Sequence, residues 1–270
     1  MDQSSASERA KPAISDIVAG LARDPAFASL RPSFVNYYDD VARNARLDAL
    51  TSRFVADGDL AFDIGSHVGD RIGALRRAGA RVVALEPQPL CAAAIRQIYA
   101  GDASVTVVEA ACGATEGKLP LNVNSSNPTV STLSDSFVAS AADADGWREQ
   151  VWDTTIDVPV TTLDALIARY GVPAFVKIDV EGFEADVLAG LSVPLPALSF
   201  EFTTINRDVA VASIQQVMAQ GRYSFNAALG ETHELLFPTW VSADEAIAYV
   251  TDIPHEANSG DFYAVREMSR

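Results

Sequence analysis

The chain has 270 residues, 49% of them hydrophobic, which is enough to bury one substantial core without requiring a second one. Its formal net charge of −16 would repel a phosphate backbone and argues against a nucleic-acid partner. The N-terminus lacks a signal-peptide core and no apolar run reaches membrane-spanning length, so we expect a cytoplasmic protein with no membrane insertion.

Cysteine and histidine usage does not indicate a disulfide or a zinc site. Cys91 and Cys112 fall in segments predicted to be packed, so we expect reduced thiols. The three histidines are far apart in the sequence, which gives no support for a zinc cluster.

Residues 1–54 are predicted to form an N-terminal helical extension. The first 12 or so are polar and small, and we expect a frayed end there. Apolar positions then recur at helical spacing, with a break at Arg31-Pro32. The extension could cover one end of a sheet or cap a pocket, and packing alone is the simpler interpretation.

Residues 55–270 alternate strand-like and helical segments, which is typical of a parallel α/β sheet. The expected strands are 60–64, 81–85, 105–109, 175–178 and 198–202, and the expected helices are 68–78, 89–99, 162–170, 183–191 and 209–221. A closing pair of strands is expected at 223–228 and 261–266, with a helix near 243–250 between them.

A glycine-rich turn follows the first expected strand, at Asp63-Ile64-Gly65-Ser66-His67-Val68-Gly69. Glycines at a strand-to-helix turn let the backbone approach a ligand closely. About twenty residues later the second strand ends at Glu86, where an acid can accept hydrogen bonds from ribose hydroxyls. The order of strand, glycine turn, helix, strand and terminal acid predicts an adenosine site, although a packed turn explains many such glycines. His67 could line the pocket, make a structural hydrogen bond or face solvent.

The turn departs from the dinucleotide fingerprint, because Ser66-His67 stands where that pattern needs a second glycine after Gly65. A cofactor without phosphate fits better, and Asp63 could help bind the ammonium of its amino-acid portion. S-adenosylmethionine has these properties.

The segment Val176-Lys177-Ile178-Asp179-Val180-Glu181-Gly182-Phe183-Glu184, together with the glycine turn and Glu86-Pro87, resembles the FkbM-type methyltransferases. The resemblance runs from about 59 to 202, with Ser66 in place of the small alanine usual there. It implies a class I methyltransferase Rossmann-like fold, a mostly parallel seven-stranded sheet with an antiparallel last strand. It also implies S-adenosylmethionine-dependent O-methylation, commonly of sugars, glycolipids or polyketides.

By the same resemblance, Asp63, Gly65 and Gly69 line the methionine end of the cofactor, Glu86 holds the ribose, and the main chain at 109–111 faces the adenine. The full set of candidate cofactor-binding residues is Asp63, Gly65, Ser66, His67, Gly69, Glu86, Pro87, Glu109, Ala110, Ala111 and Asp179.

Acidic residues gather where the fourth strand ends, the edge at which open α/β sheets bind ligands. A hydroxyl acceptor must lose its proton during methylation, which calls for a general base or a metal. We take Asp179 as the first candidate for this role and Glu181 as the second. Glu184 is better explained by the dipole of the following helix.

A divalent metal is a further alternative, in which Glu201 of the fifth strand joins Asp179 around Mg²⁺ or Mn²⁺. Two carboxylates without a clear third ligand are more often a polar pocket wall, so the sequence does not favour a metal.

The segment 122–132 is rich in short hydrogen-bonding side chains and is expected to be a loop. The resemblance favours a role in acceptor binding over a solvated turn for Asn124, Asn127, Ser131 and Thr132. The polar insertion 137–152 could act as a lid with Trp147 or Trp152 against the ligand, but a buried indole is equally common.

Two other functions remain open, and a third, nucleic-acid or amine methylation, is disfavoured. A nicotinamide-dependent oxidoreductase would share the fold and Glu86, and a non-catalytic adenosylmethionine-binding protein would share the cofactor site. Nucleic-acid or amine methylation usually shows Asn/Asp-Pro-Pro-Tyr/Phe after the fourth strand, which here reads Asp179-Val180-Glu181-Gly182. The expected partner is a small-molecule or glycan acceptor. The sequence leaves open whether the chain forms a homo-oligomer.

Overall fold

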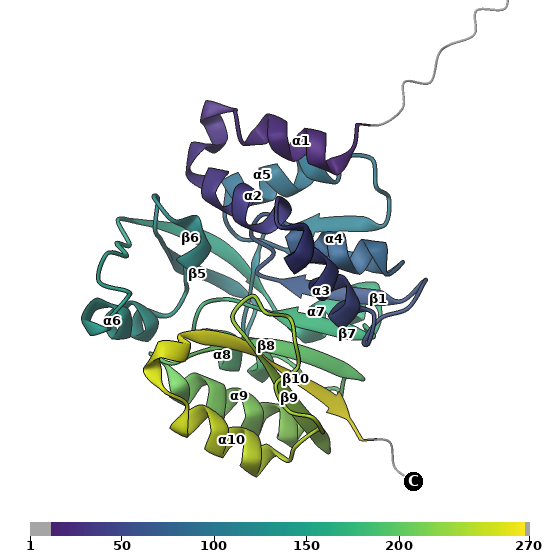
Figure 1. Ribbon diagram of the computed structural model, residues 1–270, viewed down its shortest axis with the longest axis vertical. Coiled ribbons are helices and arrows are strands. Elements are labelled where there is room, and N and C mark those ends of the chain that lie inside the picture. The colour runs from purple at the N-terminus through teal and green to yellow at the C-terminus, as the bar shows by residue number, and fades with distance from the viewer. Residues whose placement is uncertain (1–11, 268–270) are drawn as a thin grey trace, which may run out of the picture.

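The computed structural model describes residues 12–267, and the frayed end expected before about residue 12 lies almost entirely outside them. One seven-stranded sheet dominates the described part, in the order β3-β2-β1-β7-β8-β10-β9 (Figure 1). Its strands are β1 (Leu60–Ile64), β2 (Arg81–Leu85), β3 (Val105–Val108), β7 (Phe175–Ile178), β8 (Ala197–Thr203), β9 (Tyr223–Leu229) and β10 (Ser259–Arg266).

The sheet is parallel from β3 to β8, whereas β10 runs antiparallel to both of its neighbours, β8 and β9. The expected seven-stranded sheet with an antiparallel last strand is therefore confirmed. Because β1 lies between β2 and β7, the turns that follow these three strands meet at one edge.

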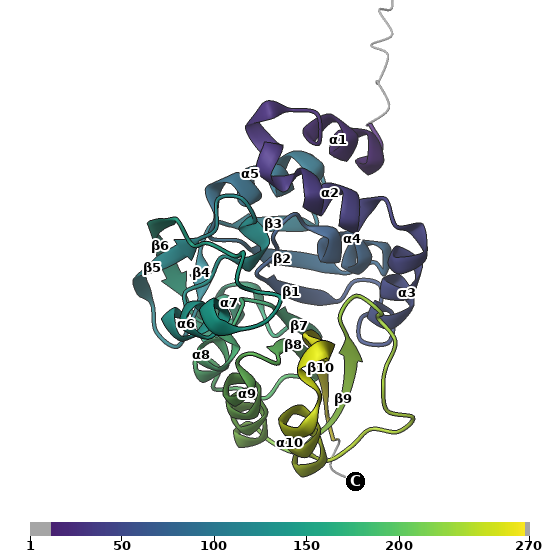
Figure 2. The ribbon, with the colours of Figure 1, turned by 60° about the vertical axis from the view of Figure 1, so that its left-hand side comes forward.

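Helices cover both faces of the sheet, and alternation along the strands explains why (Figure 2). In β1, Phe62 and Ile64 pack with the helices after residue 160, whereas Ala61 packs with the earlier helices. The later helices are α7 (Leu163–Tyr170), α8 (Glu184–Ala189), α9 (Arg207–Ala219) and α10 (Ala243–Asp252). On the other face lie α4 (Asp70–Arg77) and α5 (Pro89–Ile98), with the N-terminal helices.

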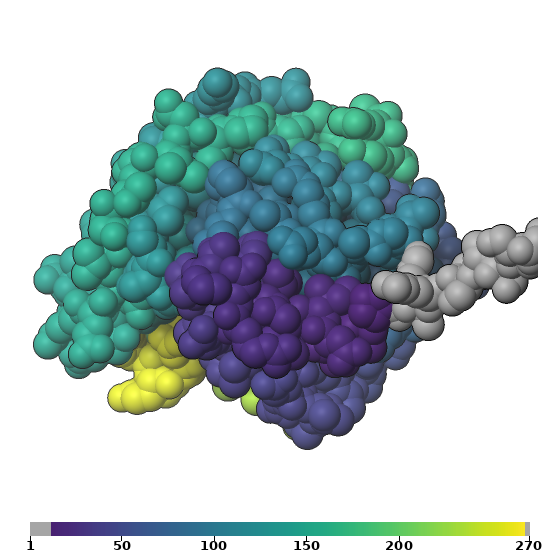
Figure 3. Space-filling model, turned by 90° about the horizontal axis from the view of Figure 1, so that it is seen from above, coloured from purple at the N-terminus to yellow at the C-terminus, as the bar shows by residue number. Residues whose placement is uncertain are grey.

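The N-terminal helices are α1 (Ile14–Leu21), the 3-10 helix η1 (Pro25–Leu30), α2 (Arg31–Tyr38) and α3 (Val41–Thr51). Pro32 stands in the first turn of α2, where a proline is tolerated, so the predicted break at Arg31-Pro32 is confirmed. Val18, Leu30 and Phe34 are buried in the same core as α5 and the sheet. Figure 3 shows these purple helices packed over the blue and teal segments.

A second sheet of three strands stands beside the main one. Its strand order is β4-β6-β5, so the last strand in sequence lies in the middle. It consists of β4 (Ala111–Cys112), β5 (Gly117–Val123) and β6 (Thr154–Thr161). The expected loop at 122–132 is wrong at its start, since Asn122 and Val123 belong to β5. The sequence hides β5 because most of the strand is exposed and because it contains Pro120.

Two smaller expectations concern the cysteines and the membrane. Cys91 and Cys112 are both buried and unpaired, which confirms the expected free thiols. Within residues 12–267, none of the helices has the length and apolar character needed to cross a membrane.

Candidate active site

A cavity of about 830 Å³, including space open to solvent, lies where β1, β2 and β7 end. The turn after β1, the end of β2, the second sheet, the end of β7 and helix α2 all contribute to its walls. The polar lining residues include Tyr37, Ser66, His67, Asp70, Arg71, Glu86, Gln88, Thr129, Ser131, Thr132, Lys177, Asp179, Glu181 and Glu231. The cavity is thus at the predicted edge of the sheet.

The glycine turn is shaped by contacts within the protein. Gly65 has φ +81°, and a Cβ on it would lie 1.7 Å from the carbonyl oxygen of Asp179. Gly69 has φ +84° at the start of α4, where a Cβ would crowd Tyr99 and Ile72. Gly65 lines the cavity, as expected, while Gly69 does not. The expectation for Gly69 is therefore wrong, and packing of the chain against itself requires a glycine at both positions.

Glu86 is held firmly at the cavity wall. One carboxylate oxygen accepts the backbone N–H of His67 and the other that of Gln88, both at 2.8 Å. Burial raises the pKa of Glu86 to about 7, although these two hydrogen bonds oppose the shift. Each oxygen keeps a free lone pair, so this carboxylate at the cavity wall can accept further hydrogen bonds, as a ribose-binding acid must.

His67 lines the cavity and is tied to two other segments. Its Nε2 lies 2.7 Å from Ser33 Oγ and 3.2 Å from Thr129 Oγ1. Burial lowers the pKa of the imidazole to about 4, so the ring is neutral at physiological pH. The neighbouring Ser66 also lines the cavity, and its hydroxyl donates to the Asp63 carbonyl. His67 therefore joins the glycine turn to the N-terminal helices, an arrangement that places it in the cavity rather than in solvent.

Pro87, Ala110 and Ala111 form part of an apolar wall with Leu85, Leu121 and Leu133. Glu109 is placed differently, because its side chain is exposed and pairs with Arg96 at 2.6 Å. An apolar wall next to Glu86 suits a planar base, and of the expected main-chain segment 109–111, Ala110 and Ala111 line the cavity whereas Glu109 does not.

Asp63 lies outside the cavity lining. It is fully buried, and neither carboxylate oxygen has a hydrogen-bond partner among the described residues. Burial raises its pKa to about 6, and the charge of Lys177 on the adjacent strand opposes the rise. The structure thus gives Asp63 no direct access to a ligand, contrary to the expectation that it lines the methionine end.

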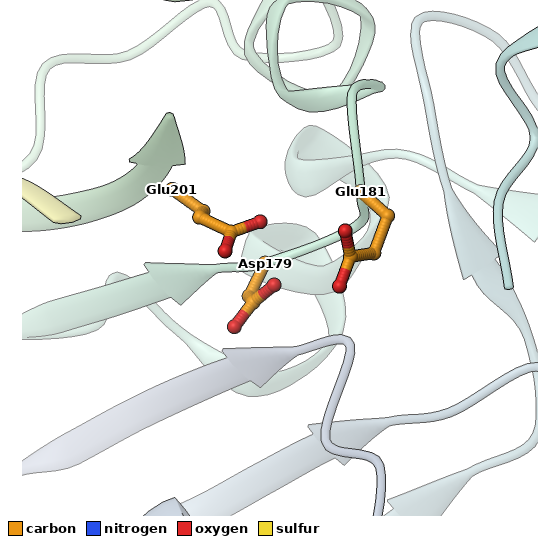
Figure 4. A group of neighbouring side chains, drawn as sticks. All are labelled: Asp179, Glu181 and Glu201. Atoms are coloured by element: carbon orange, nitrogen blue, oxygen red, sulfur yellow. The ribbon is translucent and has the colours of Figure 1, made fainter. Parts of the chain in front are cut away.

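Asp179 and Glu181 face the cavity at the end of β7. Glu201 approaches them from β8, and Figure 4 shows the three carboxyl groups converging. Lys177 contacts one Asp179 oxygen, and burial raises the pKa of both Glu181 and Glu201 well above its usual range. Glu184 stands in the first turn of α8, as expected, and its Oε1 accepts the N–H groups of Val180 and Gly182.

The four expected acceptor-binding residues divide into two pairs. Ser131 and Thr132 line the cavity, with Thr132 Oγ1 donating to the Glu181 carbonyl at 2.7 Å. Asn124 and Asn127 do not line it, and both amides donate to Oε1 of Gln150. The two asparagines therefore hold the following insertion in place instead of facing the cavity.

The insertion overlaps helix α6 (Asp135–Asp143), and neither of its tryptophans lines the cavity. Trp147 and Trp152 both meet the buried ring of Phe137 edge-on. Trp147 donates to Asn258 and Trp152 to the Val130 carbonyl. Packing, rather than contact with a ligand, accounts for both indoles.

Several polar lining residues were not site candidates in the sequence analysis: Tyr37, Asp70, Arg71, Gln88, Lys177 and Glu231. Lys177 had a usable signal, because residues i and i+2 of a strand share a face and Asp179 was already a candidate. Glu231 lies after β9 and binds Arg43 at 2.5 Å and His233 at 3.0 Å, a long-range arrangement with no local signal. Tyr37 shows that the N-terminal helices reach the cavity as well as pack on the sheet.

The strand order, the antiparallel β10 and a cavity at the glycine turn together define a class I methyltransferase fold. A model of the methyltransferase FkbM domain matches residues 63–232, more than half of the chain. The chain belongs to the FkbM methyltransferase family.

Among solved structures, the chain is similar to an O-methyltransferase from Bacillus cereus in complex with SAH, at 13% identity and a TM-score of 0.45 over 97% of this chain and 94% of that one. It is also similar to precorrin-6y C5,15-methyltransferase from Geobacter metallireducens, at 13% identity and a TM-score of 0.43 over 82% and 86%. A TehB-like SAM-dependent methyltransferase from Corynebacterium glutamicum has 11% identity and a TM-score of 0.42 over 87% and 100%. No curated protein matches.

Proposed function

We propose that this chain is an S-adenosylmethionine-dependent O-methyltransferase that acts on a hydroxyl group of a sugar, glycolipid or secondary metabolite. The observation that carries the proposal is one cavity that runs from the anchored Glu86 carboxylate to the acids Asp179 and Glu181. The same cavity therefore holds a carboxylate that can accept hydrogen bonds from ribose hydroxyls and a candidate general base.

The described residues fit the proposed cofactor. Glu86 would accept hydrogen bonds from the ribose hydroxyls, and the apolar wall around Ala110 and Ala111 would contact the adenine. Arg71 and Lys177 supply cations for the carboxylate of the methionine portion. Burial by itself would lower the pKa of Lys177, but the charges of Asp179 and Asp261 raise this pKa above its ordinary range, so the lysine stays charged. The cofactor's sulfonium supplies an activated methyl group, so the protein mainly has to align the acceptor.

Asp179 is the group that we propose takes up the proton of the acceptor hydroxyl. Its side chain is 29% exposed and it lines the cavity, so a ligand hydroxyl can reach it. Glu181 stands beside it and has one buried oxygen without a partner among the described residues. A carboxylate in this position can accept the proton of a hydroxyl held behind the methyl group.

The rest of the cavity suits a polar acceptor. Ser131, Thr132, Thr129 and Tyr37 present hydroxyl groups, and Glu231 adds a carboxylate. Sugar-like molecules offer matching donors and acceptors. The net charge of −16 continues to disfavour a nucleic acid in this role.

The rival oxidoreductase has less support from the turn itself. At the start of α4, where a dinucleotide pyrophosphate would lie on the helix N-terminus, the side chain of His67 lines the cavity. Hydrogen bonds to Ser33 and Thr129 hold this side chain in position, so a pyrophosphate would have to break them to displace it.

A screen of acceptors tests the proposal. The protein is incubated with methyl-labelled S-adenosylmethionine and a panel of sugars, glycolipid headgroups, phenolic and polyketide alcohols, amines and oligonucleotides. We expect label to enter a hydroxyl compound and to stay on oxygen, as mass spectrometry and nuclear magnetic resonance would show. Label found on an amine or a nucleobase, with the alcohols unlabelled, would contradict O-methylation.

A further inference from the structure

Three carboxylates from different parts of the chain converge beside the cavity. Asp179 and Glu181 follow β7, and Glu201 lies in β8, the neighbouring parallel strand. One oxygen from each lies within 4.8 Å of the others. Figure 4 shows that the carboxyl groups enclose a common space at the edge of the sheet.

Glu181 gives this cluster a feature that mutual proximity alone does not explain. The residue is only 8% exposed, and its Oε2 is buried without a hydrogen-bond partner among residues 12–267. Its carboxyl group points toward Asp179 and Glu201 (Figure 4). A buried polar atom without a partner carries a substantial free-energy cost, so a native structure normally supplies one.

Glu201 repeats the pattern, since its Oε2 is also buried without a partner in the described part of the chain. Lys177 binds an oxygen of Asp179, and no cation among the described residues pairs with Glu181 or Glu201. The site therefore has unused oxygen ligands.

We propose that Asp179, Glu181 and Glu201 bind a hard divalent cation, Mg²⁺ or Mn²⁺. Mg²⁺ takes oxygen ligands at about 2.0–2.1 Å, so two ligand atoms on opposite sides of the ion are about 4.0–4.2 Å apart. The three oxygens, all within 4.8 Å of one another, are close to this requirement. Glu181 supplies the third ligand that the sequence analysis lacked.

The metal site stands independently of the methyl acceptor, whereas its use in catalysis rests on the proposed function. An ion at this wall of the cavity would be in position to lower the pKa of an acceptor hydroxyl. Asp179 and Glu181 would then act as ligands that hold the ion, with the alcohol proton released to solvent or to a nearby carboxylate.

Titration of the full chain with Mn²⁺, followed by electron paramagnetic resonance, tests the site directly. We expect one Mn²⁺ to bind to the wild type, Mg²⁺ to displace it, and Glu201→Gln to weaken binding by about tenfold or more. Glu116→Gln is the matched control, because Glu116 is exposed and distant in sequence from the cluster. Thermal unfolding of each variant establishes that it is folded, and Mg²⁺ should raise the melting temperature of the wild type and the control only.

Equal Mn²⁺ binding by the wild type and folded Glu201→Gln, or no binding by the wild type, would overturn the metal site. Neither result depends on methyl transfer, since no acceptor or cofactor is present. Conversely, a chain that binds Mn²⁺ as described but labels no hydroxyl compound would retain the metal site and lose the proposed function.

Discussion

Replacing Asp179 with asparagine is expected to lower turnover by about a hundredfold or more, while affinity for S-adenosylhomocysteine stays near the wild-type value. The substitution keeps the shape of the side chain but removes the charge needed to accept a proton or to hold a cation. Asp179 lines the cavity next to Glu181, so the loss would fall on the chemical step. Single-turnover kinetics with a labelled methyl group would measure it.

Asp157→Asn is the matched control, since Asp157 is exposed on β6. Asp179 also pairs with the buried Lys177, so the melting temperature of each variant has to be measured alongside its activity. Full activity of a folded Asp179→Asn enzyme would reject both the base and the ligand role. Alignment of the two substrates would then be the main source of catalysis.

Replacing Gly65 with alanine is expected to lower the free energy of unfolding by about 3 kcal/mol or more. Two costs combine at this position: a left-handed backbone at φ +81° and a Cβ placed 1.7 Å from the Asp179 carbonyl oxygen. The backbone at the end of β7 would have to move away, so cofactor binding should fall with stability. Chemical denaturation and calorimetry measure the two effects.

Gly58 offers a matched control, because its φ is +84° and a Cβ on it would meet nothing within 4 Å. Gly58→Ala should cost only the backbone term, about 1–2 kcal/mol. If both variants lost the same stability, the contact between Gly65 and Asp179 would contribute nothing, and the account of the turn would be wrong.

The main sheet could be predicted from the sequence because its strands are short apolar runs between helices. Phe175–Ile178, for example, is expected and observed with the same bounds. The acids at the strand ends were equally predictable, since parallel strands bring their carboxyl ends to one edge. Glu86 and Asp179 therefore both face the cavity.

Features that depend on long-range packing were not predictable in this way. The strands β5 and β6 pair with each other although they lie far apart in the sequence. In addition, β5 is too exposed to show a buried pattern. Asn124 and Asn127 looked like ligand-binding amides, but their amide groups bind Gln150, more than twenty residues away. Asp63 looked accessible because it ends a strand, whereas its side chain is fully buried.

Calorimetric titration with S-adenosylhomocysteine and with NADH tests the central claim, a cofactor site for S-adenosylmethionine, most directly. We expect binding of S-adenosylhomocysteine, no measurable binding of NADH, and a loss of about 1–3 kcal/mol in Glu86→Gln because the ribose hydroxyls would face an amide in place of the carboxylate. A clear NADH isotherm, with no heat from S-adenosylhomocysteine, would contradict the assignment and favour an oxidoreductase.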